Sequence, residues 1–102
     1  MHLTAEQLDT IRTYFAARPV KRAWLFGSYA RGEADEQSDV DLLVDLDEQR
    51  PVGWELATWP LDLQVALRVP AVDVVPRRSV YPNLLPFIQQ DQLLIYEATN
   101  RG

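Results

Sequence analysis

The sequence contains no cysteine and a single histidine, His2, in 102 residues. Without cysteine the chain can form neither disulfide bonds nor thiolate zinc sites, which suits a reducing cytoplasm. With one histidine at the chain end, neither a Ser-His-Asp triad nor a Cys-His pair is expected. These absences remove several common catalytic and metal-binding classes from consideration.

Positive charge is also scarce, with 10 Lys and Arg against 15 Asp and Glu and a net charge of −5. A general affinity for nucleic acid normally needs a basic patch, so direct nucleic acid binding is not expected. No apolar run approaches the length that spans a membrane, and the N-terminus has no signal-peptide pattern. The sequence therefore predicts a soluble, cytoplasmic protein with no membrane partner.

The length and the hydrophobic content of 47% predict one domain over residues 1–102 with a single core. The chain has no room for a separate domain to hold an acceptor molecule. We expect another chain or a second copy to complete any acceptor site.

Asp39 and Asp41 stand at the start of an apolar run that extends to Leu46. Successive side chains of a strand point to opposite faces, so the two aspartates project the same way, with Val40 pointing to the other face. Two unit charges about 4 Å apart repel by roughly 4 kcal/mol at an effective dielectric constant near 20. A cation is therefore expected there, and oxygen-only ligands favour Mg²⁺, whose shell substrate phosphates often complete.

Gly27 and Ser28 follow an earlier apolar run, residues 23–26. Glycine allows a sharp turn and a close ligand approach, and serine can lead into a helix whose free N–H groups favour anionic oxygen. This pair is predicted to bind the phosphates of a nucleoside triphosphate.

The order of these residues resembles a known family signature. Gly27-Ser28, ten intervening residues and Asp39-Val40-Asp41 are similar to the G-S-x10-D-x-D motif of the minimal nucleotidyltransferases, which belong to the DNA polymerase β-like superfamily; Arg31-Gly32 and Ser38 also fit. The similarity covers roughly residues 8–96, although only residues 27–41 are highly specific. The fold it implies is an α/β (α+β) domain with a small mixed sheet flanked by helices.

The resemblance also implies an activity: metal-dependent transfer of AMP from ATP to a hydroxyl, with one or two Mg²⁺ ions. It implies a third carboxylate on the strand beside the D-x-D strand, and Asp73 matches that position as a metal ligand or as the base that accepts the hydroxyl proton. Close relatives in this family are small bacterial antitoxins that inactivate a helical ribonuclease toxin of the HEPN family by attaching AMP to a tyrosine. Such a toxin, in a hetero-oligomer, is the expected partner.

Other polar and aromatic side chains leave alternatives open. Arg31 either contacts phosphate or forms a buried pair that holds its loop to the acidic strand. Asp45 keeps the parity of Asp41, but it lies roughly 13 Å away, beyond the reach of the same ion. Arg77 and Arg78 could reach a triphosphate or a partner, although such a pair is most often only solvated. Trp54 could stack on a base or meet a partner, although packing within the domain is the expected role.

The hydrophobic pattern predicts the order of the elements. Thr4 begins a helix with a capping box to Gln7, Tyr14 is expected to pack on that helix, and Pro60 should break a later helix near Trp59. The predicted helices cover residues 4–18, 52–67 and 83–90, with a short one after Ser28, and the predicted strands cover residues 20–26, 39–46, 71–75 and 93–96.

Two other functions stay open at this stage. The protein could be an antitoxin that neutralises its partner by binding alone, in which case the aspartates would be dispensable for protection. It could also transfer a nucleotidyl group to a small hydroxylated molecule, which the missing acceptor domain makes less favourable.

Overall fold

A mixed sheet of four strands, in the order β3-β2-β1-β4, organises residues 1–99, the part of the chain described by this computed structural model. Strand β1 pairs antiparallel with β2 and β4, and β2 pairs parallel with β3. The elements are α1 (Ala5–Ala16), β1 (Val20–Phe26), α2 (Ser28–Arg31), β2 (Val40–Leu46), η1 (Trp54–Thr58), α3 (Trp59–Leu67), β3 (Val72–Pro76), η2 (Arg77–Ser79), α4 (Leu85–Asp91) and β4 (Leu93–Glu97). The predicted fold class, a small mixed sheet flanked by helices, is confirmed.

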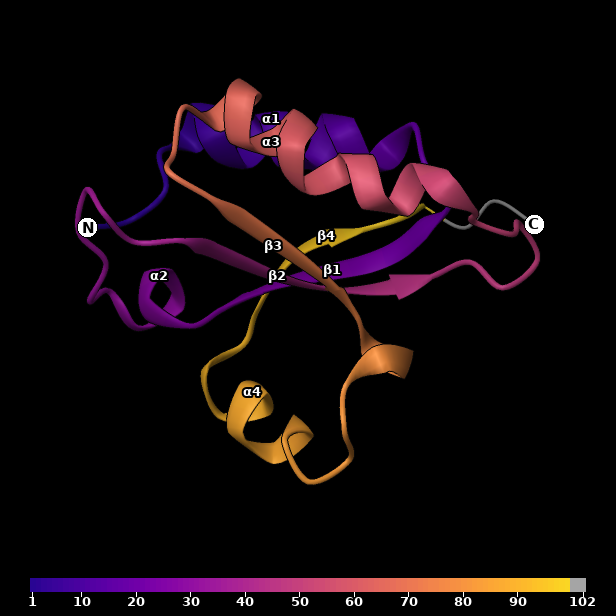
Figure 1. Cartoon of the computed structure of the whole chain (residues 1–102). Coiled ribbons are helices and arrows are strands. Elements are labelled where there is room, and N and C mark those ends of the chain that lie inside the picture. The colour runs from indigo at the N-terminus through magenta and orange to yellow at the C-terminus, as the bar shows by residue number, and fades with distance from the viewer. Residues whose placement is uncertain (100–102) are drawn as a thin grey trace.

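The two faces of the sheet are covered differently (Figure 1). Helices α1 and α3 lie side by side over one face, and α4 lies on the other side. Alternate residues of the strands face α1 and α3 and form the core with Phe15, Trp59 and Leu63, which are at most 1% exposed. The second face is therefore the more accessible one, and the odd-numbered residues of β2 point toward it.

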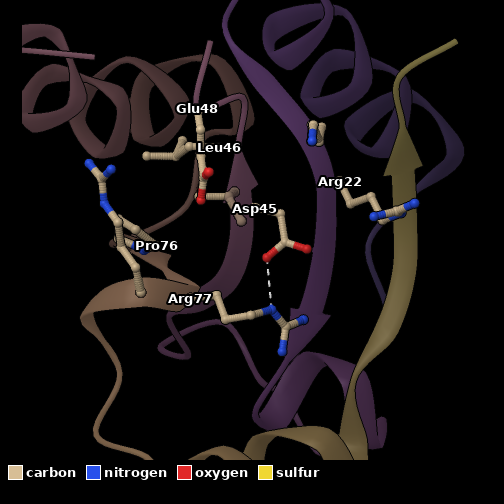
Figure 2. A pocket seen from close by; sticks show the side chains of 9 residues that line it. Arg22, Asp45, Leu46, Glu48, Pro76 and Arg77 are labelled. Atoms are coloured by element: carbon tan, nitrogen blue, oxygen red, sulfur yellow. Dashed lines mark hydrogen bonds and ion pairs between the residues drawn. The ribbon is translucent and has the colours of Figure 1, made fainter. Parts of the chain in front are cut away.

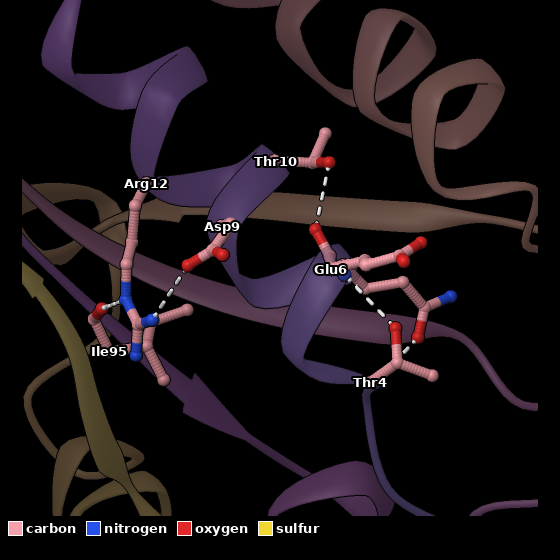
Figure 3. A network of polar contacts seen from close by, with 7 residues as sticks. Thr4, Glu6, Asp9, Thr10, Arg12 and Ile95 are labelled. Carbon is pink, nitrogen blue, oxygen red and sulfur yellow. Dashed lines mark hydrogen bonds and ion pairs between the residues drawn. The ribbon is translucent and has the colours of Figure 1, made fainter.

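Helix α1 begins as its sequence predicts. The Thr4 hydroxyl accepts a hydrogen bond from the Gln7 backbone N–H, and the Gln7 side chain accepts one from the Thr4 N–H, which completes the capping box. Figure 3 shows this cap together with Arg12, whose Nε donates to the backbone carbonyl of Ile95 at 2.7 Å. These contacts fix the start of α1 and tie the helix to β4.

The predicted break near Trp59 is confirmed. Residues Trp54–Thr58 form a 3₁₀ turn, and α3 starts at Trp59 with Pro60 in its first turn, where the missing N–H costs no helical hydrogen bond. Trp59, Leu63 and Leu67 are buried, as the apolar stripe indicates.

The packing predicted for Trp54 and for Tyr14 is wrong for the first and confirmed for the second. Trp54 is 93% exposed, so its expected packing role is wrong: the 3₁₀ turn that holds it contributes no buried side chain. Tyr14 packs as expected, with its hydroxyl donating to Asp62 at 2.5 Å and Arg18 lying over its ring. Burial, and then the hydrogen bond to Asp62, raise the pKa of Tyr14 to about 12.

Within residues 1–99, no helix combines the length and the apolar character needed to cross a membrane.

Candidate active site

Three carboxylates lie at one end of the sheet. Asp41 is the second residue of β2 and is in register with Phe26 of β1 on one side and with Asp73 of β3 on the other. Asp39 directly precedes β2 and is exposed, as is Asp73, whereas Asp41 is half-buried. Because register partners share a face, Asp41 and Asp73 project together onto the second face, and alternation along the chain brings Asp39 to the same side.

The turn after β1 lies directly against this group. Gly27 has φ 74° and ψ −155°, a region that is essentially limited to glycine. A methyl group at Gly27 would clash with the Asp41 carboxylate. The missing side chain therefore lets the turn and the carboxylate occupy neighbouring space.

Helix α2 starts at Ser28, immediately after this turn. The Gly27 carbonyl accepts hydrogen bonds from the N–H groups of Ala30 and Arg31, at 3.1 and 3.2 Å, so the first turn closes on Gly27. The backbone N–H groups of Ser28 and Tyr29, which precede these donors, have no carbonyl partner within the helix. Such groups, beside the Ser28 hydroxyl, are suited to bind anionic oxygen.

The environment of Asp41 is strongly acidic. Burial is the main cause that raises the pKa of Asp41 to about 6, followed by the negative charge of Asp73 and a hydrogen bond between the two carboxyl groups. Asp39 adds to the effect, and the positive charge of Arg31 opposes it. Positive charge at this position is therefore insufficient to balance the carboxylates.

This donor set fits Mg²⁺. It offers only carboxylate oxygens, and a bound cation would stabilise the charged form of Asp41, which burial and then the negative charge of Asp73 disfavour. Among residues 1–99, no three Asp, Glu, His or Cys side chains are already gathered in a metal-binding arrangement. Mg²⁺ usually takes part of its coordination from substrate phosphates. The assignment of Asp39, Asp41 and Asp73 as ligands stays a prediction.

The raised pKa of Asp41 has a consequence for stability. The carboxyl group binds its proton more tightly in the folded chain than in the unfolded chain, so stability should fall as pH rises from about 4 to about 6 and stay lowered above that range. In metal-free buffer at pH 7.5, Asp41→Asn should raise the free energy of unfolding by about 1–2 kcal/mol, less than the roughly 3 kcal/mol of a two-unit shift because solvent screens a half-buried group. Urea denaturation at pH 7.5 and pH 4 tests this, since the gain should largely disappear at pH 4. An equal gain at both values would contradict it.

Arg31 pairs with carboxylates outside the acidic strand. Its Nε donates to Glu33 at 2.9 Å and its Nη1 donates to Asp91 of α4 at 3.1 Å, and its side chain is 44% exposed. These hydrogen bonds, with that to Glu33 first, raise the pKa of Arg31. The predicted buried pair with the acidic strand is therefore wrong, because carboxylates outside that strand approach the guanidinium more closely. Phosphate binding by Arg31 stays a prediction.

Two carboxylates near the site have arginine partners that the sequence does not indicate. No local pattern marks Asp91, since it meets Arg31 only through the placement of α4. Asp45 was excluded as a ligand of the same ion, and it instead accepts a hydrogen bond from Arg77 at 2.7 Å. The shared parity of Asp41 and Asp45 is the signal that places both on the second face.

Comparison with known proteins gives a consistent result. Residues 8–95 match the family model described as a nucleotidyltransferase domain. The candidate protein adenylyltransferase MJ1379 of Methanocaldococcus jannaschii is 35% identical over 78 residues, which are 76% of each chain. The protein adenylyltransferase MntA of Thermococcus cleftensis is 45% identical over 51 residues, which are 45% of this chain and 52% of that protein.

Solved structures share the fold. The structure of a candidate minimal nucleotidyltransferase has a TM-score of 0.73 and 34% identity, and the alignment covers 86% of this chain and 88% of that one. A toxin–antitoxin complex with AMP-PNP has a TM-score of 0.71 and 22% identity, with coverage of 94% and 76%. A complex of a tri-AMPylated HEPN toxin of Shewanella oneidensis with its MNT antitoxin has a TM-score of 0.65 and 21% identity, with coverage of 91% and 71%.

Proposed function

Because this chain belongs to the nucleotidyltransferase domain family, we propose that it is a protein adenylyltransferase that transfers AMP from ATP to a tyrosine of a HEPN-family toxin and so acts as its antitoxin. The observation that carries the proposal is the contact between the two halves of the site: the Gly27 turn lies against Asp41, which lies beside Asp73. The names of its relatives support the protein substrate, and the HEPN and AMP-PNP complexes support the partner and the nucleotide.

The phosphates of ATP bind at Gly27, Ser28 and Arg31. Arg31 can reach them by exchanging its exposed contacts with Glu33 and Asp91 for phosphate oxygens, because exposed ion pairs contribute little energy. Asp39 and Asp41 would hold Mg²⁺, and the bound ion would supply positive charge where negative charge develops during transfer.

The acceptor hydroxyl oxygen attacks the α-phosphorus and forms a new P–O bond. The bond from that phosphorus to the oxygen bridging to the β-phosphate breaks, and pyrophosphate leaves. Asp73 takes the proton of the hydroxyl, since it projects beside Asp41 and is exposed to an incoming group. The product is a tyrosine that carries AMP through a phosphodiester bond.

Transfer of label from α-³²P-ATP to the purified partner tests this activity. We expect labelled partner with Mg²⁺, no label after EDTA treatment, and recovery when Mg²⁺ is restored. Peptide mapping should place the label on tyrosine. Label that persists in EDTA would contradict metal dependence, and label on serine or threonine alone would contradict the proposed acceptor.

A further inference from the structure

The second face of the sheet continues from the carboxylates to a group of basic side chains. In register, Asp41 pairs with Phe26, and two residues farther along the strands Leu43 pairs with Trp24. Two residues beyond that, Asp45 pairs with Arg22. Register partners share a face, so Asp41, then the apolar Leu43 and Trp24, then the charged Asp45 and Arg22 follow one another along it.

Arg77 extends over the apolar part of this face. It follows β3 directly, its Nε donates to Asp45 at 2.7 Å, and its guanidinium carbon lies 4.6 Å from the centre of the Trp24 ring. The Arg77 side chain is only 28% exposed, in contrast to the solvated pair that the sequence favoured. Among residues 1–99, the bond from Nε to Asp45 is the only hydrogen bond that the Arg77 side chain makes. The N–H groups of both terminal nitrogens are therefore available to a ligand. Asp45 and Trp24 thus hold a guanidinium in one orientation without occupying its terminal donors.

Arg77 lies in a hollow with a volume of about 360 Å³ (Figure 2). Figure 2 shows Asp45 and Arg77 pointing toward one another, with Arg22 on the neighbouring strand. Four of the ten Lys and Arg residues line the hollow, although the chain as a whole has a net charge of −5. Its charged lining residues are Lys21, Arg22, Arg77, Arg78, Asp45 and Glu48. Arg22 is paired with Glu97 and Arg77 with Asp45, both at 2.7 Å. Lys21 and Arg78 then add two positive charges against the one negative charge of Glu48, so the hollow is suited to a negatively charged group.

The chemistry of the transfer places the acceptor on this side. Phosphoryl transfer requires the attacking and leaving oxygens to lie roughly in line across the phosphorus. The leaving pyrophosphate is assigned to Gly27 and Ser28, which directly follow the end of β1 at Phe26, beside Asp41. With pyrophosphate on the Gly27 side, the attacking hydroxyl would come from the side away from Gly27, where Trp24, Leu43 and the hollow follow along the same face.

We propose that this hollow is an acceptor subsite in which Arg77 binds an oxyanion carried by the acceptor. The oxyanion is either a carboxylate near the modified hydroxyl or the phosphodiester of an AMP already attached, and a planar guanidinium suits both. The inference rests on the proposed function, because that function fixes the direction from which the acceptor arrives. It assigns a binding role to Arg77 and a positioning role to Asp45 and Trp24.

The test compares Arg77→Gln with Arg68→Gln, which removes the same charge from the exposed C-terminal end of α3. Binding of the HEPN-family partner, unmodified and carrying one AMP, is measured by calorimetry without ATP, and AMP additions are followed by intact mass. Arg77→Gln should weaken one of the two forms by roughly 10- to 100-fold, the range for a lost charged hydrogen bond, with the KM for ATP unchanged. Arg77→Lys should recover part of the loss.

Weaker binding of the unmodified partner would identify a carboxylate as the ligand. A loss confined to the AMP-bearing form and to second additions would identify the phosphodiester. Equal binding of both forms to Arg77→Gln and Arg68→Gln would overturn the proposal. If Arg77→Gln fails to fold, Lys21→Gln/Arg78→Gln, at exposed positions of the same hollow, replaces it. Failure of the wild type to transfer AMP would contradict the proposed function, while the binding comparison would still test the hollow.

Discussion

Replacing Asp39 and Asp41 together by asparagine is expected to lower AMP transfer by roughly 10³-fold or more, the scale on which preorganised charge in an active site contributes to rate. The substitution removes the negative charges of Asp39 and Asp41 at the start of β2, and these two side chains are the expected Mg²⁺ ligands. The fold should persist, because Asp39 is exposed and loss of the Asp41 charge relieves its repulsion with Asp73. The rate of pyrophosphate release in the presence of the partner measures the effect.

The matched control is Glu36→Gln, which removes an exposed carboxylate from the loop before β2 and should leave the rate unchanged. Cells that produce the HEPN partner provide a second readout. If the double variant is folded, binds the partner and still protects these cells, the protein is an antitoxin by binding alone, and the proposed role of transfer is contradicted.

Replacement of Gly27 by alanine should lower transfer by about 10²-fold or more and destabilise the fold by about 1–3 kcal/mol. The cost has two sources: a backbone conformation that other residues rarely adopt, and a methyl group that meets the Asp41 carboxylate. Either the turn or the carboxylate must move, and both belong to the proposed site. Transfer rate and urea denaturation measure the two effects.

Gly53→Ala is the control for this substitution. Gly53 has φ −103°, and nothing lies within 4 Å of the position where its Cβ would be. This variant should therefore show nearly wild-type activity and stability. If Gly27→Ala behaved like Gly53→Ala, the close approach of the turn to Asp41 would not matter for function.

The elements that depend on local pattern are predictable from the sequence. The range of β1 agrees with its prediction, Thr4 forms the expected capping box, and the helix break falls at Trp59 beside Pro60. The placement of Asp73 on the strand beside Asp41 is implied by the family resemblance rather than by local pattern, and the parallel register of β2 and β3 agrees with it. Proline, capping and alternation act within a few residues, so a single sequence contains the necessary information.

The contacts that cross between elements could not be predicted in this way. Arg31 meets Asp91 through the position of α4, and Arg77 meets Asp45 and Trp24 through the register of three strands. Trp54 is exposed although aromatic residues usually pack, because its 3₁₀ turn buries none of its side chains. Each of these outcomes depends on tertiary geometry, to which local spacing is insensitive.

The most direct test of transfer to a protein is the intact mass of the HEPN-family partner after incubation with this protein, ATP and Mg²⁺. A mass gain in whole AMP units, roughly 329 Da each from the balance of the proposed reaction, is expected with the wild type and absent with Asp39→Asn/Asp41→Asn. An unchanged mass, despite a stable complex between the two proteins, would contradict the proposal.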